Sequence, residues 1–185
     1  MTAQRIKTID MIYVAVGAVL LTVCSWITVP MTVPFTLQTF AVFSVLLILG
    51  GYRGTLSILI YIMMGAVGLP VFSGFKGGVG VLFGNTGGYI IGFLFTGLVY
   101  TAMTKLIGKK LFIEAAALTL GLFVCYAFGT AWFRFLYIRN TGDVGLLTVL
   151  TWCVFPFIIP DICKMVLAFV ISYRVRRTIG HPEDL

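Results

Sequence analysis

Charged side chains are scarce in this 185-residue sequence, at 10% of the residues, whereas hydrophobic ones make up 60%. A soluble domain carries about 25% charged and about 45–50% apolar residues. The mean hydropathy of +1.09 points the same way. The composition therefore excludes an ordinary soluble domain. It predicts that the chain, residues 1–185, forms a single integral-membrane domain in a lipid bilayer.

The sequence also has little of what metal and catalytic sites need. Its one histidine, His181, lies in the polar C-terminal tail, and its four cysteines stand alone within apolar segments, at Cys24, Cys125, Cys153 and Cys163. A zinc site needs a cluster of such ligands, so no metal or other cofactor is expected. No nucleotide-binding loop or recognisable catalytic motif occurs in the sequence. The chain is therefore predicted not to be an enzyme and not to hydrolyse ATP by itself.

Six apolar segments follow one another along the chain. A membrane-spanning helix needs about 20 mostly apolar residues. We predict helices over residues 9–28, 37–49, 55–69, 86–107, 112–137 and 146–173, with the last one broken or kinked at Pro156 and Pro160. The first run is too long for the apolar part of a signal peptide, so it is predicted to be retained. The fold class is thus an all-α membrane protein with six transmembrane helices.

The positions of the basic residues predict the orientation of these helices. Cytoplasmic segments carry an excess of lysine and arginine. Two residues, Lys76 and Arg139, fall in the loops on one side of the membrane. Nine lie at the chain ends or in the turns on the other side: Arg5, Lys7, Arg53, Lys105, Lys109, Lys110, Arg174, Arg176 and Arg177. Both termini are therefore predicted to be cytoplasmic. No basic face with interleaved aromatics occurs, so nucleic acid is not an expected partner.

Two irregular but apolar loops, residues 29–36 and 70–85, flank the short second and third helices. These helices, of about 13–15 residues, reach only about 20–23 Å at helical rise. Non-helical backbone at membrane depth persists where protein or a cavity buries it. The loops are therefore predicted to fold into the outer half of the bundle and to line or cover a pocket. Two ordinary external loops are the alternative.

Asp161 and Lys164 are charged residues inside the sixth apolar segment, and their spacing of three places them on one helical face. Measured from Arg174, they lie about 20 Å and about 15 Å along the helix, deep in the membrane. Buried ionisable groups in a bilayer are costly and mark functional sites. A structural ion pair and a proton or ion relay are the alternatives.

Other polar residues occur where helices begin. Asn85, Thr86 and Tyr89 stand in the segment that opens the fourth helix, and Thr36 and Gln38 stand at the start of the second. Their side chains, with the unpaired N–H groups of a helix N-terminus, suit a polar ligand group arriving from outside. The alternative is a glycine-permitted turn with a cap for the first group and helix capping for the second.

The motifs together resemble the BioY family, the biotin-specific substrate-capture component of energy-coupling factor (ECF) transporters. The matching stretches, in chain order, are Val-Pro-Phe-Thr-Leu-Gln-Thr at 33–39, Tyr-x-x-x-Gly-Ala-Val-Gly-Leu-Pro-Val-Phe at 61–72, Gly-Asn-Thr-Gly-Gly-Tyr at 84–89, and Pro-Phe-x-x-x-Asp-x-x-Lys at 156–164. Each stretch alone is weak evidence, but the set spans most of the chain and is specific.

The resemblance implies a six-helix fold that holds biotin near the outer surface. It also implies two partners, a transmembrane coupling protein and a pair of cytoplasmic ATPases, and a capture component that topples in the membrane to release its ligand. The first helix would meet the coupling protein through small residues, here Ala15, Gly17 and Ala18, because small side chains let helices approach closely in membranes.

Biotin offers a ureido ring, an apolar thiophane ring and a carboxylate, and the sequence has candidates for each. Asp161 is expected to accept from a ureido N–H, and Lys164 or Asn85 to donate to the ureido oxygen. The rings would pack against aromatic residues, at Phe72, Phe75, Tyr89 and Trp152. Lys76 or Arg134 would meet the carboxylate.

Two other functions remain open at this point. A small intramembrane enzyme would use Asp161 and Lys164 in catalysis, although such enzymes usually have a second carboxylate or a histidine. An autonomous proton-coupled carrier would need neither a coupling protein nor ATPases.

Overall fold

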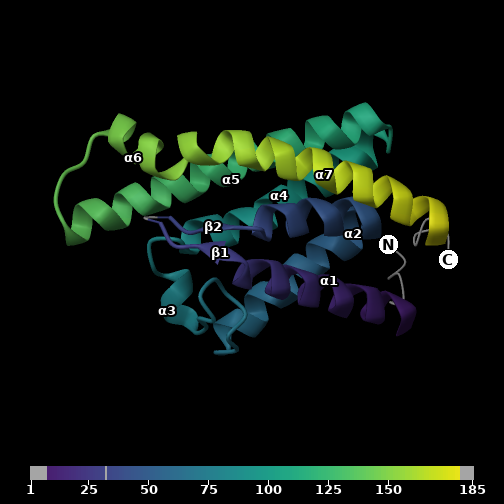
Figure 1. Cartoon of the computed structure of the whole chain (residues 1–185), viewed down its shortest axis with the longest axis horizontal. Helices are drawn as coiled ribbons and strands as arrows, with labels where there is room; N and C mark the ends of the chain where they lie inside the picture. Colours follow the sequence, from purple (N-terminus) through teal and green to yellow (C-terminus); the bar gives the residue numbers. More distant parts are fainter. Residues whose placement is uncertain (1–7, 32, 180–185) are drawn as a thin grey trace.

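The structure, a computed structural model, describes residues 8–31 and 33–179, and within them it is mostly helical (Figure 1). Five stretches are long and apolar enough to cross a membrane. Two short strands accompany the helices. The elements are α1 (Thr8–Trp26), β1 (Thr28–Val29), β2 (Phe35–Thr36), α2 (Gln38–Ala66), α3 (Val79–Leu82), α4 (Gly87–Ile107), α5 (Leu111–Asn140), α6 (Leu146–Cys153) and α7 (Phe155–Ile179).

Helix α2 is a hairpin of two short legs, residues 38–49 and 51–66, that reverses at Gly50 (Figure 1). Gly50 has φ 80° and ψ 170°, a conformation that glycine adopts far more readily than other residues. A Cβ atom at Gly54 would lie only 2.9 Å from the Leu46 Cα, so the legs touch beside the turn. The two predicted short helices are confirmed, but the predicted five-residue turn is wrong, because helix resumes at Gly51.

The last apolar segment is divided between α6 and α7 at Val154, which has φ −126° and ψ −57°. The predicted break in the last helix is present, but it lies at Val154, two residues before Pro156, and Pro160 stands inside α7. Pro156 stands in the first turn of α7, where its missing N–H would have no helical partner in any case. With the legs of α2 counted separately and α6–α7 taken together, the described chain has the six apolar segments that the sequence predicts.

The two predicted apolar loops fold back against each other at one end of the bundle, and one of them contains strands that an all-α prediction omits. Strand β1 pairs antiparallel with β2 through Thr28 and Thr36. In the second loop, Phe72 bridges Lys76 and helix α3 follows. Ser73 Oγ donates a 3.0 Å hydrogen bond to Thr28 Oγ1 and so joins the loops.

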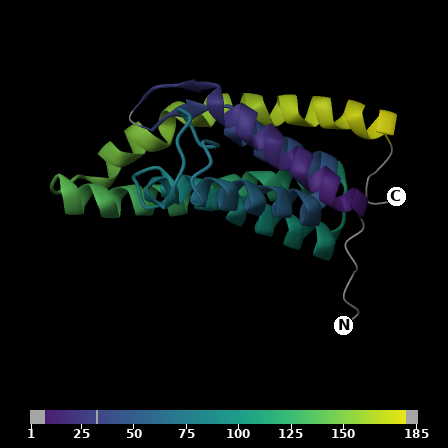
Figure 2. The same ribbon diagram turned by 90° about the horizontal axis from the view of Figure 1, so that it is seen from below.

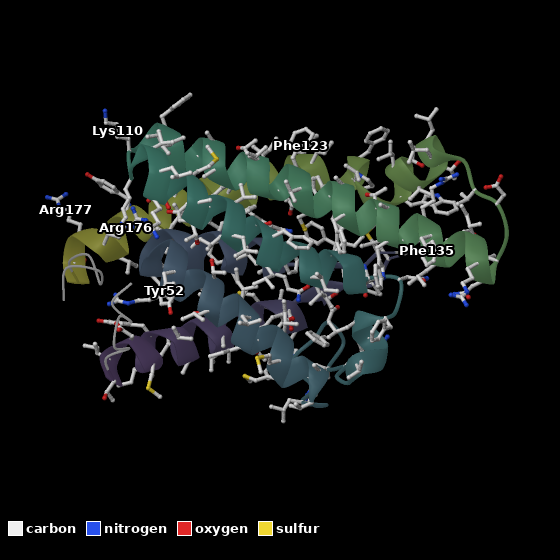
Figure 3. All side chains as sticks on the ribbon, turned by 180° about the vertical axis from the view of Figure 1, so that it is seen from behind. Tyr52, Lys110, Phe123, Phe135, Arg176 and Arg177 are labelled. Carbon is white, nitrogen blue, oxygen red and sulfur yellow. The ribbon has the colours of Figure 1, made fainter. Side chains whose placement is uncertain are left out.

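The first turn of α1 and the last turn of α7 lie at the same end of the molecule (Figures 1 and 2). Tyr52, Lys110, Arg176 and Arg177 gather at this basic end, whereas Phe123 and Phe135 project from the side of α5 (Figure 3). Arg5 and Lys7, which the orientation argument also used, lie outside the described residues. The strands, α3 and the α5–α6 connection form the opposite end.

A buried polar cluster joins four helices at the basic end. Arg176 NH2 lies 2.8 Å from Glu114 Oε1, and Tyr100 donates a 2.8 Å hydrogen bond to the same oxygen. Arg176 also donates to the Leu47 carbonyl, in the last turn of the first α2 leg. Glu114 was not predicted to be a buried carboxylate, because it follows the Lys109–Lys110 turn closely in the sequence.

Candidate functional site

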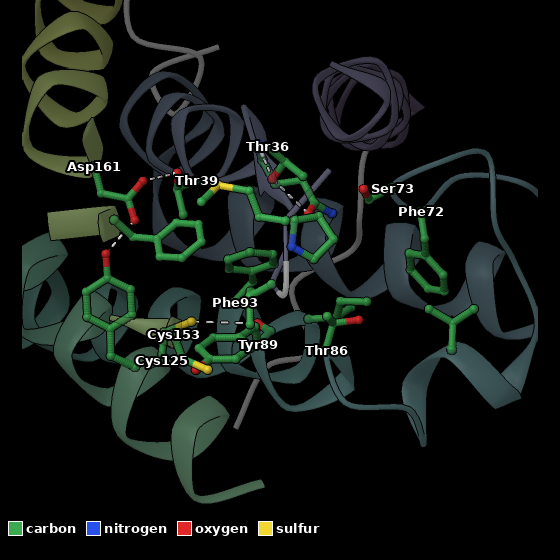
Figure 4. A pocket seen from close by; sticks show the side chains of 18 of the residues that line it. Thr36, Thr39, Phe72, Ser73, Thr86, Tyr89, Phe93, Cys125, Cys153 and Asp161 are labelled. Atoms are coloured by element: carbon green, nitrogen blue, oxygen red, sulfur yellow. Dashed lines mark hydrogen bonds between the residues drawn. The ribbon is translucent and has the colours of Figure 1, made fainter. Parts of the chain in front are cut away.

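A cavity of about 300 Å³ lies at the end of the bundle where the two loops meet (Figure 4). Helices α2, α3, α4, α5 and α7, the α6 terminus and both loops contribute to its walls. The lining residues are Met31, Val33, Pro34, Thr36, Gln38, Thr39, Phe72, Ser73, Lys76, Val81, Thr86, Tyr89, Ile90, Phe93, Cys125, Tyr126, Cys153, Phe157, Asp161 and Lys164. A mostly apolar wall with a few converging polar groups is typical of small-molecule sites.

Asp161 and Lys164 form a buried ion pair in this wall. Helix α7 brings them to one face, and Lys164 Nζ lies 2.8 Å from Asp161 Oδ1. Their side chains are 2% and 7% exposed. The Lys164 ammonium also lies 4.1 Å from the centre of the Phe35 ring, a cation–π contact. The pair therefore replaces much of the hydration that both charges would have in water.

The hydrogen bonds of this pair leave little free capacity. The Lys164 ammonium has three N–H donors, and they reach the Thr36 carbonyl at 2.7 Å, Thr39 Oγ1 at 3.1 Å and Asp161 Oδ1 at 2.8 Å. Asp161 Oδ1 also accepts from Thr39 at 2.8 Å, and Oδ2 accepts from Tyr126 at 2.5 Å. A carboxylate offers about four acceptor positions, so three are used and one remains for a ligand.

Gln38, at the start of α2, is held by its neighbours rather than left free. Its Nε2 donates a 2.5 Å hydrogen bond to the Tyr61 hydroxyl, and its Oε1 accepts from Thr36 Oγ1 at 3.1 Å. Tyr61 packs edge-on against Phe72, with ring centres 5.5 Å apart. This chain of contacts fixes one wall of the cavity from the first loop to the second.

Tyr89 reaches the cavity from the first turn of α4. Its hydroxyl lies 3.0 Å from Thr130 Oγ1, and its carbonyl accepts from the Cys125 thiol at 3.6 Å. Close packing of α4 on α5 explains this position, because Gly129 lies beneath the Tyr89 ring and leaves no room for a Cβ. The ring is therefore held in place as a rigid wall.

Eight of the residues proposed from the sequence are brought together around the cavity: Thr36, Gln38, Phe72, Lys76, Thr86, Tyr89, Asp161 and Lys164. Asp161 lies on one side and Phe72 on the opposite side, with Tyr89 between them (Figure 4). These positions come from four different stretches of sequence, and the tertiary fold makes them neighbours.

Four other proposed residues do not line it. Asn85 is exposed, beside the start of α4. Phe75 is 64% exposed and stacks on Trp26, with ring centres 4.9 Å apart. Trp152 packs against Tyr137, again outside the cavity wall. The fourth, Arg134, lies on the surface of α5 and donates a hydrogen bond to the Val144 carbonyl. Their spacing in the sequence gave no information on which way these side chains face.

Several wall residues were not predicted from the sequence, above all Thr39 and Tyr126, whose hydroxyls donate hydrogen bonds to Asp161. Thr39 ends the first family-like stretch, and this was an available signal. Tyr126 stands in an apolar run of α5 without any local sign of its role. Phe93 and Phe157 also line the cavity.

The predicted small patch on α1 is divided between two faces. Ala15 is exposed, but Ala18 is only 1% exposed and Gly17 is buried. A Cβ at Gly17 would collide with Ser57 and come within 3.0 Å of Leu49. Gly17 and Ala18 therefore let α1 pack on α2, and the three residues do not form one surface toward a partner.

The sequence was compared with known protein families. The model of the BioY family matches residues 1–181. The chain belongs to the BioY family. Members at similar distance include the biotin transporter BioY of Thermotoga maritima, 36% identical over 91% of this chain and 96% of that one. The biotin transporter BioY2 of Lactococcus lactis is 30% identical, with 97% of each chain covered.

A solved structure agrees with this membership. The chain superposes on a crystal structure described as the S-component for biotin from an ECF-type ABC transporter. The TM-score is 0.82 at 26% identity, and 98% of this chain and 97% of the other are covered. The BioY fold therefore extends over essentially the whole chain, loops included.

Proposed function

We propose that this chain captures biotin from outside the cell as the membrane-embedded substrate-binding component of an ECF-type importer. The observation that carries the proposal is the cavity in this chain of the BioY family. Its wall is mostly apolar and contains one buried ion pair. The two relatives described above are named biotin transporters, and the match covers nearly their full length. The ligand is transported, so it is not a cofactor.

The remaining hydrogen-bonding capacity suits the ureido ring. The unused acceptor position of Asp161 can take one ureido N–H. Lys164 has no spare donor in the present arrangement, so we assign it first to holding the Asp161 carboxylate in position. It can donate to the ureido oxygen after releasing Thr39 or Thr36. The thiophane ring would then pack on Tyr89 and Phe93.

Lys76 is the candidate partner of the biotin carboxylate. It is the lining lysine of the second loop and is exposed at its tip, so an ammonium there remains hydrated while it pairs with the ligand. An exposed pair of this kind contributes about 0–1 kcal/mol. We therefore expect Lys76 to tune affinity, and the Asp161 end of the cavity to decide specificity.

The proposal includes an orientation in which both termini are cytoplasmic. Lys110, Arg176 and Arg177 gather at the end that contains the first turn of α1 and the last turn of α7 (Figure 3). Cytoplasmic segments favour such an excess. The loops and the cavity then face outward, toward incoming biotin.

The proposal also includes two partners, a transmembrane coupling protein and a pair of cytoplasmic ATPases. The sequence carries no nucleotide-binding loop of its own, and a solved relative comes from an ECF-type ABC transporter. No catalytic step is assigned to Asp161 and Lys164. Both are held by hydrogen bonds within the wall rather than poised beside a nucleophile.

Binding of biotin, thiamine and riboflavin to the purified chain tests the substrate directly. Calorimetry should give one saturable site for biotin and none for the other two at the same concentrations. Two variants of α3 provide a matched comparison. Val81→Trp fills the cavity wall and should abolish biotin binding, whereas Val79→Trp points outside it and should not. Equal binding by both variants would place the biotin site elsewhere.

Uptake experiments distinguish the importer from its rivals. Proteoliposomes with the chain, coupling protein and ATPases should accumulate biotin only when ATP is present, without sensitivity to a proton uncoupler. Uncoupler-sensitive uptake by the chain alone would instead support an autonomous carrier. Chemical conversion of biotin by the purified chain would support an enzyme.

A further inference from the structure

A second hollow lies on the outer surface of the bundle, away from the biotin cavity. It has a volume of about 560 Å³ and shares no lining residue with the cavity. Four of its six lining residues are apolar and two are arginines. They are Ala131, Arg134, Phe135, Ile138 and Arg139 of α5 and Leu146 of α6.

The α5 residues follow helical spacing, so the hollow is a groove along one face of the helix. Ala131, Phe135 and Ile138 supply an apolar floor over about 12 Å of helix length between residues 131 and 139. Phe135 is 62% exposed and points away from the bundle (Figure 3). Leu146 forms the facing wall from α6. These apolar side chains favour contact with an acyl chain over contact with water.

The depth of the groove follows from the length of α5. The helix begins at Leu111, directly after Lys109 and Lys110. Ala131 lies about 30 Å further along at helical rise, which is the thickness of the hydrocarbon core. Ala131 therefore lies at the outer edge of the core, and the two arginines lie beyond it, at the level of the headgroups on the opposite surface, with Phe135 and Ile138 between them along the helix.

The charge of the groove favours an anion. Arg134 Nε donates a 3.3 Å hydrogen bond to the Val144 carbonyl, and its NH2 lies 3.9 Å from Asp143. Arg139 is exposed at the last turn of α5. With Asp143 counted, the groove carries a formal charge of about +1, complementary to one anionic headgroup. Guanidinium groups bind phosphate oxygens with paired hydrogen bonds.

We propose that this groove is a binding site for one anionic phospholipid. Its phosphate lies between Arg134 and Arg139, and an acyl chain runs from Phe135 past Ala131 toward the membrane centre. The lipid contacts both α5 and α6. It thereby stabilises the outer end of α6, whose last residue, Cys153, belongs to the biotin cavity. The site does not depend on the identity of the transported ligand.

Native mass spectrometry and thermal unfolding with added lipid test the proposal. Phosphatidylglycerol should remain bound as a single adduct and raise the melting temperature, and phosphatidylcholine should do neither. Arg139→Gln should weaken phosphatidylglycerol binding about tenfold, the effect of one lost hydrogen bond to a charged group. Arg177→Gln, at the other end of the molecule, should leave it unchanged.

A second pair of variants tests the acyl-chain part of the groove. Ala131→Phe fills its floor and should also abolish the adduct, whereas Ala102→Phe, at an exposed position of α4, should not. Glycerol phosphate, which lacks the acyl chains, should not bind. Circular dichroism and gel filtration report whether each variant is folded. Equal retention of phosphatidylglycerol and phosphatidylcholine, or equal retention by the Ala131 and Ala102 variants, would overturn the proposal.

Discussion

The Tyr126 hydroxyl donates a 2.5 Å hydrogen bond to Oδ2 of Asp161 and thereby joins α5 to α7 at the floor of the cavity. Thr39 of α2 bonds the other carboxylate oxygen at 2.8 Å. The carboxylate is thus oriented from three helices before any ligand enters. Because the carboxylate is already oriented, less conformational entropy is lost when a ligand binds.

Tyr126→Phe deletes one of these donors while it keeps the ring. We expect biotin affinity to fall about tenfold, because a hydrogen bond to a charged group contributes about 1.5 kcal/mol or more and 1.4 kcal/mol is a factor of ten. Calorimetric titration measures the change. Tyr137→Phe, on the same helix but outside the cavity wall, is the control and should bind as the unaltered chain does. Unchanged affinity in Tyr126→Phe would exclude this role.

Asp161→Asn and Lys164→Met test the ion pair itself. Each leaves a buried group mispaired, which costs about 1–3 kcal/mol, so biotin affinity should fall about ten- to a hundredfold. The melting temperature without biotin should fall by less than biotin normally raises it. Calorimetry and thermal unfolding of both single variants and the double variant give these values. Poor folding of each single variant with recovery in the double would indicate a purely structural pair.

Accessibility of introduced cysteines tests the orientation. In a background with the native cysteines replaced by alanine, a cysteine at Gly145 should react with an impermeant reagent from outside the cell, and one at Lys110 should not. Lys110 is preferred to the adjacent Gly108, whose φ of 116° a cysteine would rarely adopt. The opposite labelling pattern would reverse the topology. Biotin binding by the cysteine-free background serves as the check on its fold.

Glu114→Gln removes one charge from the buried cluster at the basic end. Breaking a buried ion pair costs about 3–5 kcal/mol. Because the Arg176 side chain keeps 17% of its exposure, we expect a loss of about 3 kcal/mol, read as a lower melting temperature. Biotin affinity should stay within about threefold, since no residue of the cluster lines the cavity. Arg177→Gln is the exposed control. A large loss of affinity would reveal coupling between the two ends.

Helix α1 offers a test of the partner surface. Ala15 and Val19 are exposed one turn apart, whereas Gly17 packs against α2. Ala15→Trp should block assembly with the coupling protein in co-purification and leave biotin binding intact. Gly17→Leu should destabilise the isolated chain instead. Normal assembly of Ala15→Trp would move the interface to another face.

The limits of sequence reasoning are visible in particular elements. The six apolar segments follow from hydropathy, which is a property of each residue and adds up locally. The position of the reversal at Gly50 was predicted correctly, but the length of the turn was not. Glycine permits a turn without determining how many residues are non-helical. Pro156 and Pro160 were expected to break or kink the last helix, yet the break lies at Val154. Pro156 in the first turn of α7 costs no hydrogen bond, and Pro160 stands inside the helix.

The candidate site shows the same division. Asp161 and Lys164 were evident from the sequence, because charge inside an apolar run is conspicuous and costly. Tyr126 was not, since a tyrosine among apolar residues carries no such contrast. Asn85 and Trp152 resembled ligand residues in type, but the direction of a side chain depends on helix phase and packing, which their spacing did not settle.

The sequence by itself determined that this chain is a membrane protein, which segments are apolar and which end is basic. Each of these depends on local composition and on the cost of burying charge in lipid. The tertiary structure alone decided which polar groups meet. Thr39 and Asp161 are 122 positions apart, and their contact depends on the Gly50 reversal and the packing of α2 on α7. Contacts at that separation arise from the arrangement of whole helices, and no local pattern encodes them.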